Sequence, residues 1–541
     1  IWADGQPLDL SGVTWRLHGG GEDQLPDPLI AAIEGSDAAP AYRGTAYVVF
    51  EDLQLALFGN RLPQFNFEVF RRPEAAADLP PAPWETVRGV ALVPGTGEYA
   101  LATRPVHIRH GKGRSVAVNV NNDRGRPDFL VSLEQLRAEL PRAKAVSLVV
   151  SWFGDDLRCD RCTLRPAVEQ AVKDGREIAW RVSGQGRAGA ATVSTIDGRP
   201  TFGGTPADET VVQAIRHMVA EGHAVMFYPF ILMDILAGNG LGDPWTGAVD
   251  QPRVPWRGRI TLSIAPGRPG SPDRTAAAAA EVAAFFGAAQ ATDFRVENGR
   301  VVYDGPPEWS YRRFILHYAH LCALAGGVDS FCIGSEMRSL TQIRDGAASY
   351  PAVRALRALA ADVRTVLGPG VRIGYAADWS EYFGHRPDDG SGNVLFHLDP
   401  LWADDNVDFI GIDNYMPLSD WRDGPDHADA AAGSIFDLSY LQGNVAGGEG
   451  FDWYYATQAD RDAQRRSPIV DSAHGEHWVF RYKDILNWWS SSHHDRPGGV
   501  RSASPTAWEP RSKPIWFTEI GCPAIDKGTN QPNVFVDPKS S

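Results

Sequence analysis

The stretch Phe331–Leu340, FCIGSEMRSL, decides the fold of this chain. Its first three residues are apolar, as in a buried strand, and after a Gly-Ser pair it delivers the carboxylate of Glu336. Lys513–Cys522, KPIWFTEIGC, has the same form and delivers Glu519. Two buried strands that each place a glutamate at the carboxyl end are what a parallel barrel needs for paired-carboxylate chemistry.

The composition is that of a large globular protein, with 541 residues, 43% hydrophobic and 22% charged. The length is greater than that of one ordinary domain. A net charge of −15 argues against a nucleic-acid groove, which needs a basic stripe. No apolar run has the length of a membrane segment, and the chain begins at Ile1 without a signal peptide. We therefore expect a fragment of something longer.

Apolar strands alternate with helical patterns from about residue 112 onward. We expect seven strands, ending near residues 120, 151, 230, 335, 376, 413 and 518. Such strands indicate a parallel sheet covered on both faces, and the polar residues after each strand favour a (β/α)8 TIM barrel. The sequence thus predicts an α/β fold with a barrel over residues 111–541. The eighth strand either lies outside the chain or is missed in this count.

Residues 1–110 have a different pattern. Ala46–Phe58 and Phe65–Phe70 look like strands, and Asp27–Glu34 resembles a short helix. Pro73–Pro83 has the composition of a loop or linker. We expect a smaller β-rich, α+β binding module here, without a catalytic constellation.

The carboxyl ends of barrel strands meet at one mouth, so Glu336 and Glu519 are expected to face each other there. Glycoside hydrolysis uses one carboxyl as general acid and another as nucleophile or base. A separation of about 5–5.5 Å gives retention of configuration, and one of about 6.5–9.5 Å gives inversion. Neither metal nor organic cofactor is required. The alternative is that both glutamates pair with arginines such as Arg338 or cap a helix.

Other polar and aromatic residues lie at or near the expected strand ends. We expect Tyr415 to hydrogen-bond Glu519. The further candidates for substrate binding are Asp413, Asn414, Trp379, Asp378, Trp152 and Asp234. For the aspartates, ordinary loop hydrogen bonding is an equal alternative. Trp516 offers another face for a sugar ring, or belongs to the core.

Five cysteines include one CxxC motif, Cys159 and Cys162. A structural zinc site normally uses a second ligand pair, which the motif lacks. Loop thiols, a local disulfide, a metal site with distant ligands and a redox pair remain open. Cys322, Cys332 and Cys522 lie in apolar settings that predict core positions.

Long motifs follow one another along the barrel part of the chain. They are Tyr228–Ile235 (YPFILMDI), Phe331–Asp345 (FCIGSEMRSLTQIRD), Tyr375–His385 (YAADWSEYFGH), Val407–Gly424 (VDFIGIDNYMPLSDWRDG), Phe451–Ala456 (FDWYYA) and Lys513–Ser541 (KPIWFTEIGCPAIDKGTNQPNVFVDPKSS). Together they resemble the TIM-barrel glycoside-hydrolase-like domain of gene transfer agent tail-tip proteins, which are large phage-tail-like proteins of alphaproteobacteria. Tyr42–Arg71 resembles the baseplate-hub module of the same proteins.

The resemblance implies a tail-tip or baseplate component of a virion-like particle, extracellular after release. It implies other tail proteins as partners, a ring homo-oligomer as the assembly, and cell-envelope or capsular glycan of a recipient bacterium as the substrate. A more distant likeness to retaining clan-A glycosidases, notably a β-mannanase-like family, implies Glu336 as acid/base and Glu519 as nucleophile. Much of that clan carries Asn before the acid, where this chain has Ser335. The alternative is a non-catalytic structural hub or a glycan-binding barrel.

Overall fold

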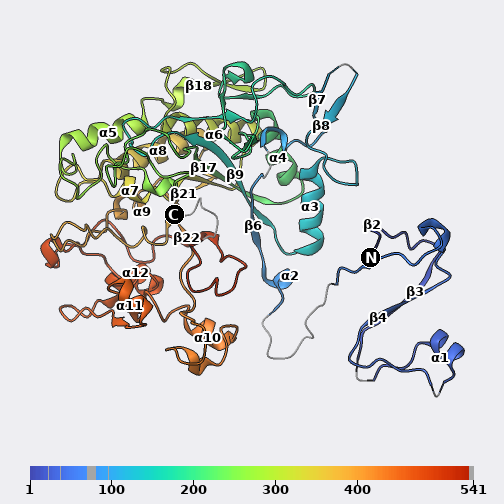
Figure 1. Ribbon diagram of the computed structural model, residues 1–541. Helices are drawn as coiled ribbons and strands as arrows, with labels where there is room; N and C mark the ends of the chain where they lie inside the picture. The colour runs from blue at the N-terminus through green and yellow to red at the C-terminus, as the bar shows by residue number, and fades with distance from the viewer. Residues whose placement is uncertain (22, 37, 70–80, 95–96, 112, 535–541) are drawn as a thin grey trace. The chain divides into compact units, whose positions relative to one another are not determined.

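A computed structural model describes residues 1–21, 23–36, 38–69, 81–94, 97–111 and 113–534 of the chain (Figure 1). The chain divides into two compact units, Ile1–Pro80 and Pro81–Ser541. This division falls at Pro80 rather than near residue 110, because strand β6 (Gly89–Leu92) already pairs within the barrel sheet. Most of the expected linker, Pro73–Pro83, lies outside the described residues.

The first unit is built from short antiparallel pairings. Its strands are β1 (Trp2–Ala3), β2 (Gln6–Pro7) and β5 (Phe65–Asn66) in one sheet, and β3 (Thr14–His18) with β4 (Tyr47–Glu51) in another. Helix α1 (Pro28–Glu34) begins after Asp27, whose side chain accepts hydrogen bonds from the backbone N–H of Leu29 and Ile30. The expected strand Ala46–Phe58 ends at Glu51, and its last residues form the 3-10 turn η1 (Leu55–Phe58).

The main sheet of the second unit has seven parallel strands, in the order β6, β9, β17, β20, β21, β22, β25, and the short strand β10 (Leu164–Arg165) pairs antiparallel with the end of β9. After β6 they are β9 (Ala145–Gly154), β17 (Ala224–Met233), β20 (Ser330–Ser335), β21 (Arg372–Asp378), β22 (Phe409–Asn414) and β25 (Ile515–Ile520). The order is sequential, as in a TIM barrel, and the sheet is nearly closed. Glu336 therefore follows the fourth strand and Glu519 lies in the seventh.

The first barrel strand is not the one that the sequence predicts. Ser115–Ala117 (β8) forms an antiparallel hairpin with His107–Arg109 (β7), so the expected barrel strand ending near residue 120 is wrong. The first strand is instead β6, only four residues long, which pairs in parallel with β9. A run of four residues is too short to stand out by periodicity.

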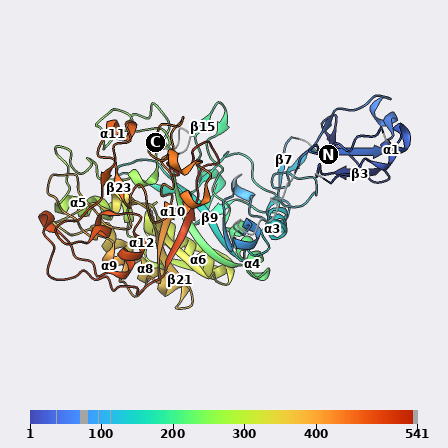
Figure 2. The same ribbon diagram turned by 90° about the horizontal axis from the view of Figure 1, so that it is seen from below.

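Four amphipathic helices cover the outer face of the sheet. They are α3 (Asp128–Glu139), α4 (Asp208–Ala220), α6 (Tyr311–Ala325) and α8 (Pro351–Leu367). Figure 2 shows α4, α6 and α8 side by side along the sheet, and α5 (Ala276–Phe286) packs on α8. Among the described helices, none combines the length and apolar character that a membrane crossing requires.

Short elements fill the connections. The β-strands are β10 (Leu164–Arg165), β11 (Ala167–Val168), β12 (Arg181–Val182), β13 (Gln185–Gly186), β14 (Ala191–Thr192), β15 (Thr195–Ile196), β16 (Arg199–Pro200), β18 (Phe294–Glu297), β19 (Arg300–Tyr303), β23 (Trp453–Tyr454) and β24 (Ser467–Pro468). The helices are α2 (Pro83–Thr86), α7 (Arg338–Thr341), α9 (Asp399–Trp402), α10 (Leu438–Gly443), α11 (Gln458–Asp462), α12 (Ile485–Ser490) and the 3-10 turns η2 (Gly97–Tyr99), η3 (Arg187–Gly189), η4 (Arg257–Arg259), η5 (Ala291–Asp293), η6 (Ala430–Ala432), η7 (His477–Phe480) and η8 (Pro497–Gly499).

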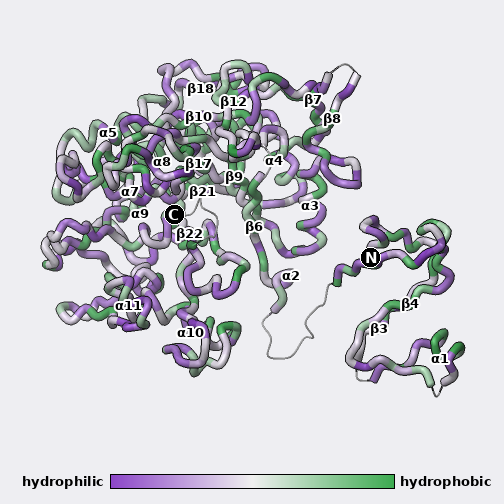
Figure 3. The backbone as a smooth tube through the Cα atoms, in the orientation of Figure 1, coloured by the Kyte–Doolittle hydropathy of each residue, from purple (hydrophilic) through white to green (hydrophobic). Residues whose placement is uncertain are grey.

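Two apolar cores lie on the two faces of the sheet, and a third small cluster contains Phe153, Ala167 and Val193. The larger core lies between the strands and the helices. In Figure 3, β9 and β17 are coloured largely as hydrophobic residues. The smaller core fills the barrel interior with Val149, Tyr228, Cys332, Ala376 and Phe409. Trp516 packs into this interior, 4.2 Å from Phe409 between ring centroids, so it belongs to the core.

Candidate active site

A bend at the end of β20 places Glu336. The pairing of β20 with β21 shifts register between Cys332 and Ser335, and Glu336 follows with φ +46° in the left-handed region. Gly334 is needed just before it, because a Cβ there would lie 1.9 Å from the hydroxyl of Tyr311. Such bulges re-aim side chains at barrel rims.

Three carboxylates from three strands meet at this mouth. One oxygen each of Glu336, Asp413 and Glu519 lies within 4.8 Å of the others. Asp413 is fully buried and accepts hydrogen bonds from the hydroxyls of Tyr228 at 2.7 Å and Thr518 at 2.6 Å. These bonds fix Asp413 at the top of the barrel interior, below the other two carboxylates.

Glu519 has an aromatic partner on the neighbouring strand. Tyr415, directly after β22, donates a hydrogen bond from its hydroxyl to Oε2 of Glu519 at 2.7 Å. This is the contact expected from the sequence. The hydrogen bond holds one oxygen of Glu519, which leaves the other for a ligand in the cavity.

Glu336 is held by two residues that sequence reasoning missed. The indole Nε1 of Trp256 donates to Oε2 of Glu336 at 2.7 Å, and a terminal nitrogen of Arg257 lies 2.9 Å from the same oxygen. The Nε of Arg257 also donates to the carbonyl and hydroxyl oxygens of Ser335, at 3.0 and 3.1 Å. The guanidinium carbon lies 3.7 Å from the ring centroid of Phe230.

Burial gives Glu336 the properties of a proton donor. Burial raises the pKa of its carboxyl from 4.5 to about 7, although Arg257 acts in the opposite direction, and the charges of Glu519 and Asp378 raise the pKa further. The pKa of Asp413 is also raised well above its usual range. Burial is the largest cause, followed by the charges of Glu519 and Glu336. A carboxyl that holds its proton near neutral pH beside a second carboxylate is suited to general acid catalysis.

The cluster opens into a cavity of about 660 Å³. Its walls are Phe202, Phe230, Ile231, Leu232, Met233, Val254, Pro255, Trp256, Arg257, Arg259, Glu336, Arg338, Asp378, Trp379, Ser380, Tyr415, Glu519 and Asn533. Aromatic rings and a few polar groups around a concave site are typical of a small-molecule or sugar site.

Five of the nine predicted site residues lie on this wall: Glu336, Glu519, Tyr415, Trp379 and Asp378. Asp413 lies beneath it. The Oδ1 atom of Asp378 accepts from the backbone N–H of Ser380 at 2.8 Å, and burial is the main cause of its raised pKa. The two strand-end glutamates were thus brought together as the sequence analysis expects.

Three predicted site residues lie elsewhere among the described residues. Trp152 is fully buried, and its Nε1 donates to the hydroxyl of Tyr318 on α6 at 3.0 Å, so it offers no face to a sugar. Val149 points into the barrel interior, and side chains alternate along a strand, so Trp152 points outward. Asp234 accepts a hydrogen bond from the backbone N–H of Ser194 at 2.8 Å, and Asn414 accepts one from Met416 at 3.1 Å.

The spacing of Glu336, Asp413 and Glu519 would also admit a metal ion. However, both oxygens of Asp413 already accept hydroxyl hydrogen bonds, and Oε2 of Glu336 contacts Trp256 and Arg257. A guanidinium beside the cluster opposes a second cation. This donor set fits catalytic carboxylates better than a metal centre.

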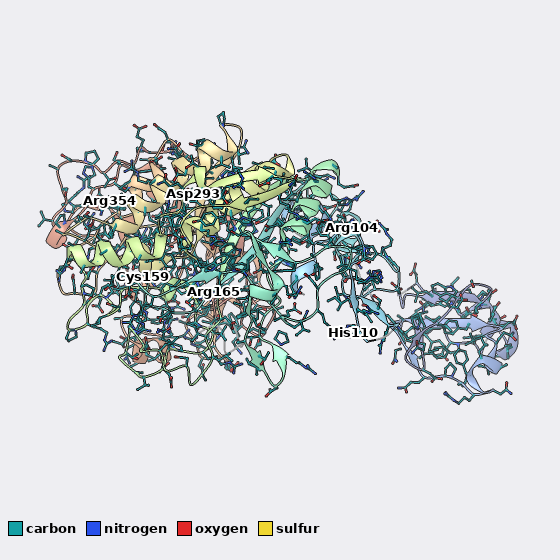
Figure 4. All side chains as sticks on the ribbon, turned by 90° about the horizontal axis from the view of Figure 1, so that it is seen from above. Arg104, His110, Cys159, Arg165, Asp293 and Arg354 are labelled. Atoms are coloured by element: carbon teal, nitrogen blue, oxygen red, sulfur yellow. The ribbon has the colours of Figure 1, made fainter. Side chains whose placement is uncertain are left out.

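Neither cysteine of the CxxC motif lies on the cavity wall. Cys159, labelled in Figure 4, and Cys162 are buried free thiols. Burial raises the pKa of both, that of Cys162 to about 12. Cys322 and Cys332 are buried as expected, whereas Cys522 is exposed, which corrects its predicted core position. Cys522 lies two residues beyond the end of β25.

The sequential parallel strands and the mouth at their carboxyl ends define a domain of the TIM-barrel type. Residues 309–541 match the family model of the GTA TIM-barrel-like domain. This part of the chain is therefore similar to that domain family.

Solved structures give further likenesses. The GH113 β-mannanase AaManA from Alicyclobacillus acidocaldarius, in complex with ManMIm, is 16% identical with a TM-score of 0.30, over 63% of this chain and 66% of that one. A GH113 β-1,4-mannanase is 15% identical with a TM-score of 0.26, over 56% and 60%. A structure of the virion of a native gene transfer agent particle is 60% identical with a TM-score of 0.14, over 18% and 22%. The chain thus spans less than two thirds of these chains. No curated protein matches the chain.

Proposed function

We propose that the barrel is a retaining glycoside hydrolase that cleaves cell-envelope or capsular glycan of a recipient bacterium. The observation that supports this most directly is the approach of Glu336 and Glu519, whose nearest carboxylate oxygens are within 4.8 Å. Retaining enzymes hold their two carboxyl groups about 5–5.5 Å apart, whereas inverting enzymes leave room for a water molecule.

In the proposed reaction, Glu336 donates its proton to the glycosidic oxygen while an oxygen of Glu519 attacks the anomeric carbon. The glycosidic bond breaks, the leaving sugar departs with the proton, and a glycosyl ester forms on Glu519. The Glu336 carboxylate then takes a proton from water, the water oxygen attacks the anomeric carbon, and Glu519 is released. Tyr415 orients Glu519 through its 2.7 Å hydrogen bond.

The test is a panel of envelope and capsular oligosaccharides incubated with the parent chain and with Glu336→Gln and Glu519→Gln. We expect cleavage with retained anomeric configuration by the parent, and a loss of at least a thousandfold in both variants. Asp234→Asn is the matched control, because Asp234 lies at a barrel-strand end but off the cavity wall. Inverted product, or unchanged cleavage by Glu519→Gln, contradicts the proposal.

We also propose that the chain belongs to the tail tip or baseplate of a gene transfer agent particle, as a ring homo-oligomer with other tail proteins as partners. The match of residues 309–541 to the GTA TIM-barrel-like domain supports this placement. Antibody labelling of purified particles tests it, with label at the end of the tail as the expected result. Label on the head, or none on intact particles, contradicts it.

A second candidate function is a barrel that binds glycan without cutting it. It is favoured by the contacts of Trp256 and Arg257 to Oε2 of Glu336, because both stabilise the ionised carboxylate. In that case the parent and Glu519→Gln bind glycan equally, and neither releases product.

A further inference from the structure

The cavity wall carries three arginines, in a chain whose net charge is −15. Arg257 is already in contact with Oε2 of Glu336. The other two also lie on the wall, where Arg259 is half-buried and Arg338 is exposed. In the described part of the chain, neither guanidinium makes a hydrogen bond or an ion pair with another residue.

These two arginines come from adjacent elements. Arg259 ends η4, Arg338 begins α7, and the two elements pack against each other. Arg338 is also two residues after Glu336 in the sequence. The acidic group that faces Arg338 is Asp378, which lies outside ion-pair distance and accepts hydrogen bonds from Ser380 instead. Two cations are thus held at the cavity with their hydrogen-bond donors unused by the described protein groups.

Such donors match an anionic ligand group. A guanidinium binds a carboxylate or phosphate through two parallel hydrogen bonds, and partial removal from water strengthens the contact. Arg259 is unusual in this respect, because most half-buried or buried arginines of the barrel unit already have acidic partners, as Arg187 has Glu98 and Arg344 has Asp273. A polyanion approaching this acidic protein needs such a local positive site to overcome the repulsion.

We infer that the glycan taken by this cavity is anionic, with a carboxylate or phosphate substituent bound by Arg259 and Arg338. The inference rests on the proposed function of the cavity as a glycan site. The wall already supplies aromatic faces for the sugar ring in Trp256 and Trp379. The two arginines add the selection of charged sugars over neutral ones.

The test measures binding rather than cleavage, with the full chain carrying Glu519→Gln. Calorimetric titrations use oligosaccharides with glucuronic or galacturonic acid, each beside its carboxyl-reduced form, and a second arm with phosphorylated and dephosphorylated pairs. In one of the two arms, we expect the acidic oligosaccharides to bind on the order of ten- to hundredfold more tightly than their neutral forms. The arm with this preference shows whether the bound substituent is a carboxylate or a phosphate. Added salt should weaken the preference.

The double variant Arg259→Gln/Arg338→Gln should abolish the preference for acidic oligosaccharides. The single variant Arg338→Lys should keep part of it. Arg253→Gln is the matched control, because Arg253 is an exposed arginine of the same segment, off the cavity wall. Equal binding of acidic and neutral forms, no binding of any acidic member, or an equal loss in Arg253→Gln overturns the inference. Cleavage by the parent is scored separately: hydrolysis without charge preference leaves the hydrolase proposal standing, and charge-selective binding without hydrolysis overturns only the hydrolase proposal.

Discussion

The guanidinium of Arg257 lies 2.9 Å from Oε2 of Glu336, the carboxyl whose pKa burial raises to about 7. Burial and Arg257 therefore act on this group in opposite directions. Burial favours the protonated acid, whereas the guanidinium favours the carboxylate. The balance between them sets the pH at which Glu336 can donate a proton.

Removal of Arg257 should shift the pH dependence of cleavage. The variant Arg257→Met lacks the charge that lowers the pKa of Glu336 most, so the effect of burial is less opposed and this pKa rises. We expect the alkaline limb of kcat/KM to move upward by roughly one pH unit. The measurement is a kcat/KM profile from pH 5 to 10, with Arg253→Gln as control. A limb that stays in place or moves downward contradicts this account of the Arg257 contact.

The raised pKa of Glu336 also predicts a pH dependence of stability. The folded state holds this proton up to about pH 7, whereas the unfolded chain releases it near 4.5, so stability falls as pH rises between these values. Glu336→Gln should remove this part of the slope and become more stable than the parent above pH 7, by at most about 3 kcal/mol.

Urea unfolding of the barrel unit at pH 5 and pH 8 measures this difference. Glu139→Gln is the control, because Glu139 is an exposed glutamate at the end of α3. Equal pH slopes for Glu336→Gln and the parent would show that the carboxyl is not protonated in the folded state.

Gly334→Ala should damage the bend that places Glu336. The new Cβ would lie 1.9 Å from the Tyr311 hydroxyl, which itself donates to the carbonyl of Ile333 at 2.6 Å. We expect a loss of at least about 2 kcal/mol in the free energy of unfolding, as for overpacked cores. Tyr311→Phe in the same chain removes the clashing oxygen and should restore part of the loss. A double variant no more stable than Gly334→Ala would mean that another contact causes the damage.

Two tryptophans should respond in opposite ways. Trp152 is fully buried in the outer core, so Trp152→Ala should lower stability by about 3–5 kcal/mol. Trp379 lies on the cavity wall, so Trp379→Ala should weaken glycan binding by about tenfold with a smaller effect on unfolding. Thermal unfolding and a binding titration on both variants make the comparison. Weaker binding in a folded Trp152→Ala protein would contradict the assignment of Trp152 to the core.

The catalytic candidates could be predicted because their signal is local. An apolar strand followed by a glutamate occurs at Glu336 and again at Glu519, and the barrel topology brings such strand ends together. The barrel type and the order of most strands follow from the same alternation of strands and helices. The short strand β6 gives no comparable signal, whereas the hairpin strand β8 has the apolar pattern of a barrel strand.

The residues around Glu336 could not be predicted in this way. Trp256 and Arg257 lie at the start of the short turn η4, in the long connection after β17. No periodicity indicates which side chains of such a connection turn inward. The prediction that Trp152 binds substrate is wrong for another reason. Neighbouring residues of a strand point to opposite faces, so a position near the strand end does not decide between cavity and core.

The two glutamates lie on strands with different support. Strand β20, before Glu336, is paired on both sides, with β17 and β21. Within the described residues, β25 pairs only with β22, and its Phe517 and Ile520 are 47% and 70% exposed. Local opening is easiest where few contacts hold a strand. Fraying of β25 would therefore remove Glu519 from the site while Glu336 stays in place, so amide hydrogen exchange around Glu519 would report the fraction of molecules with a complete site.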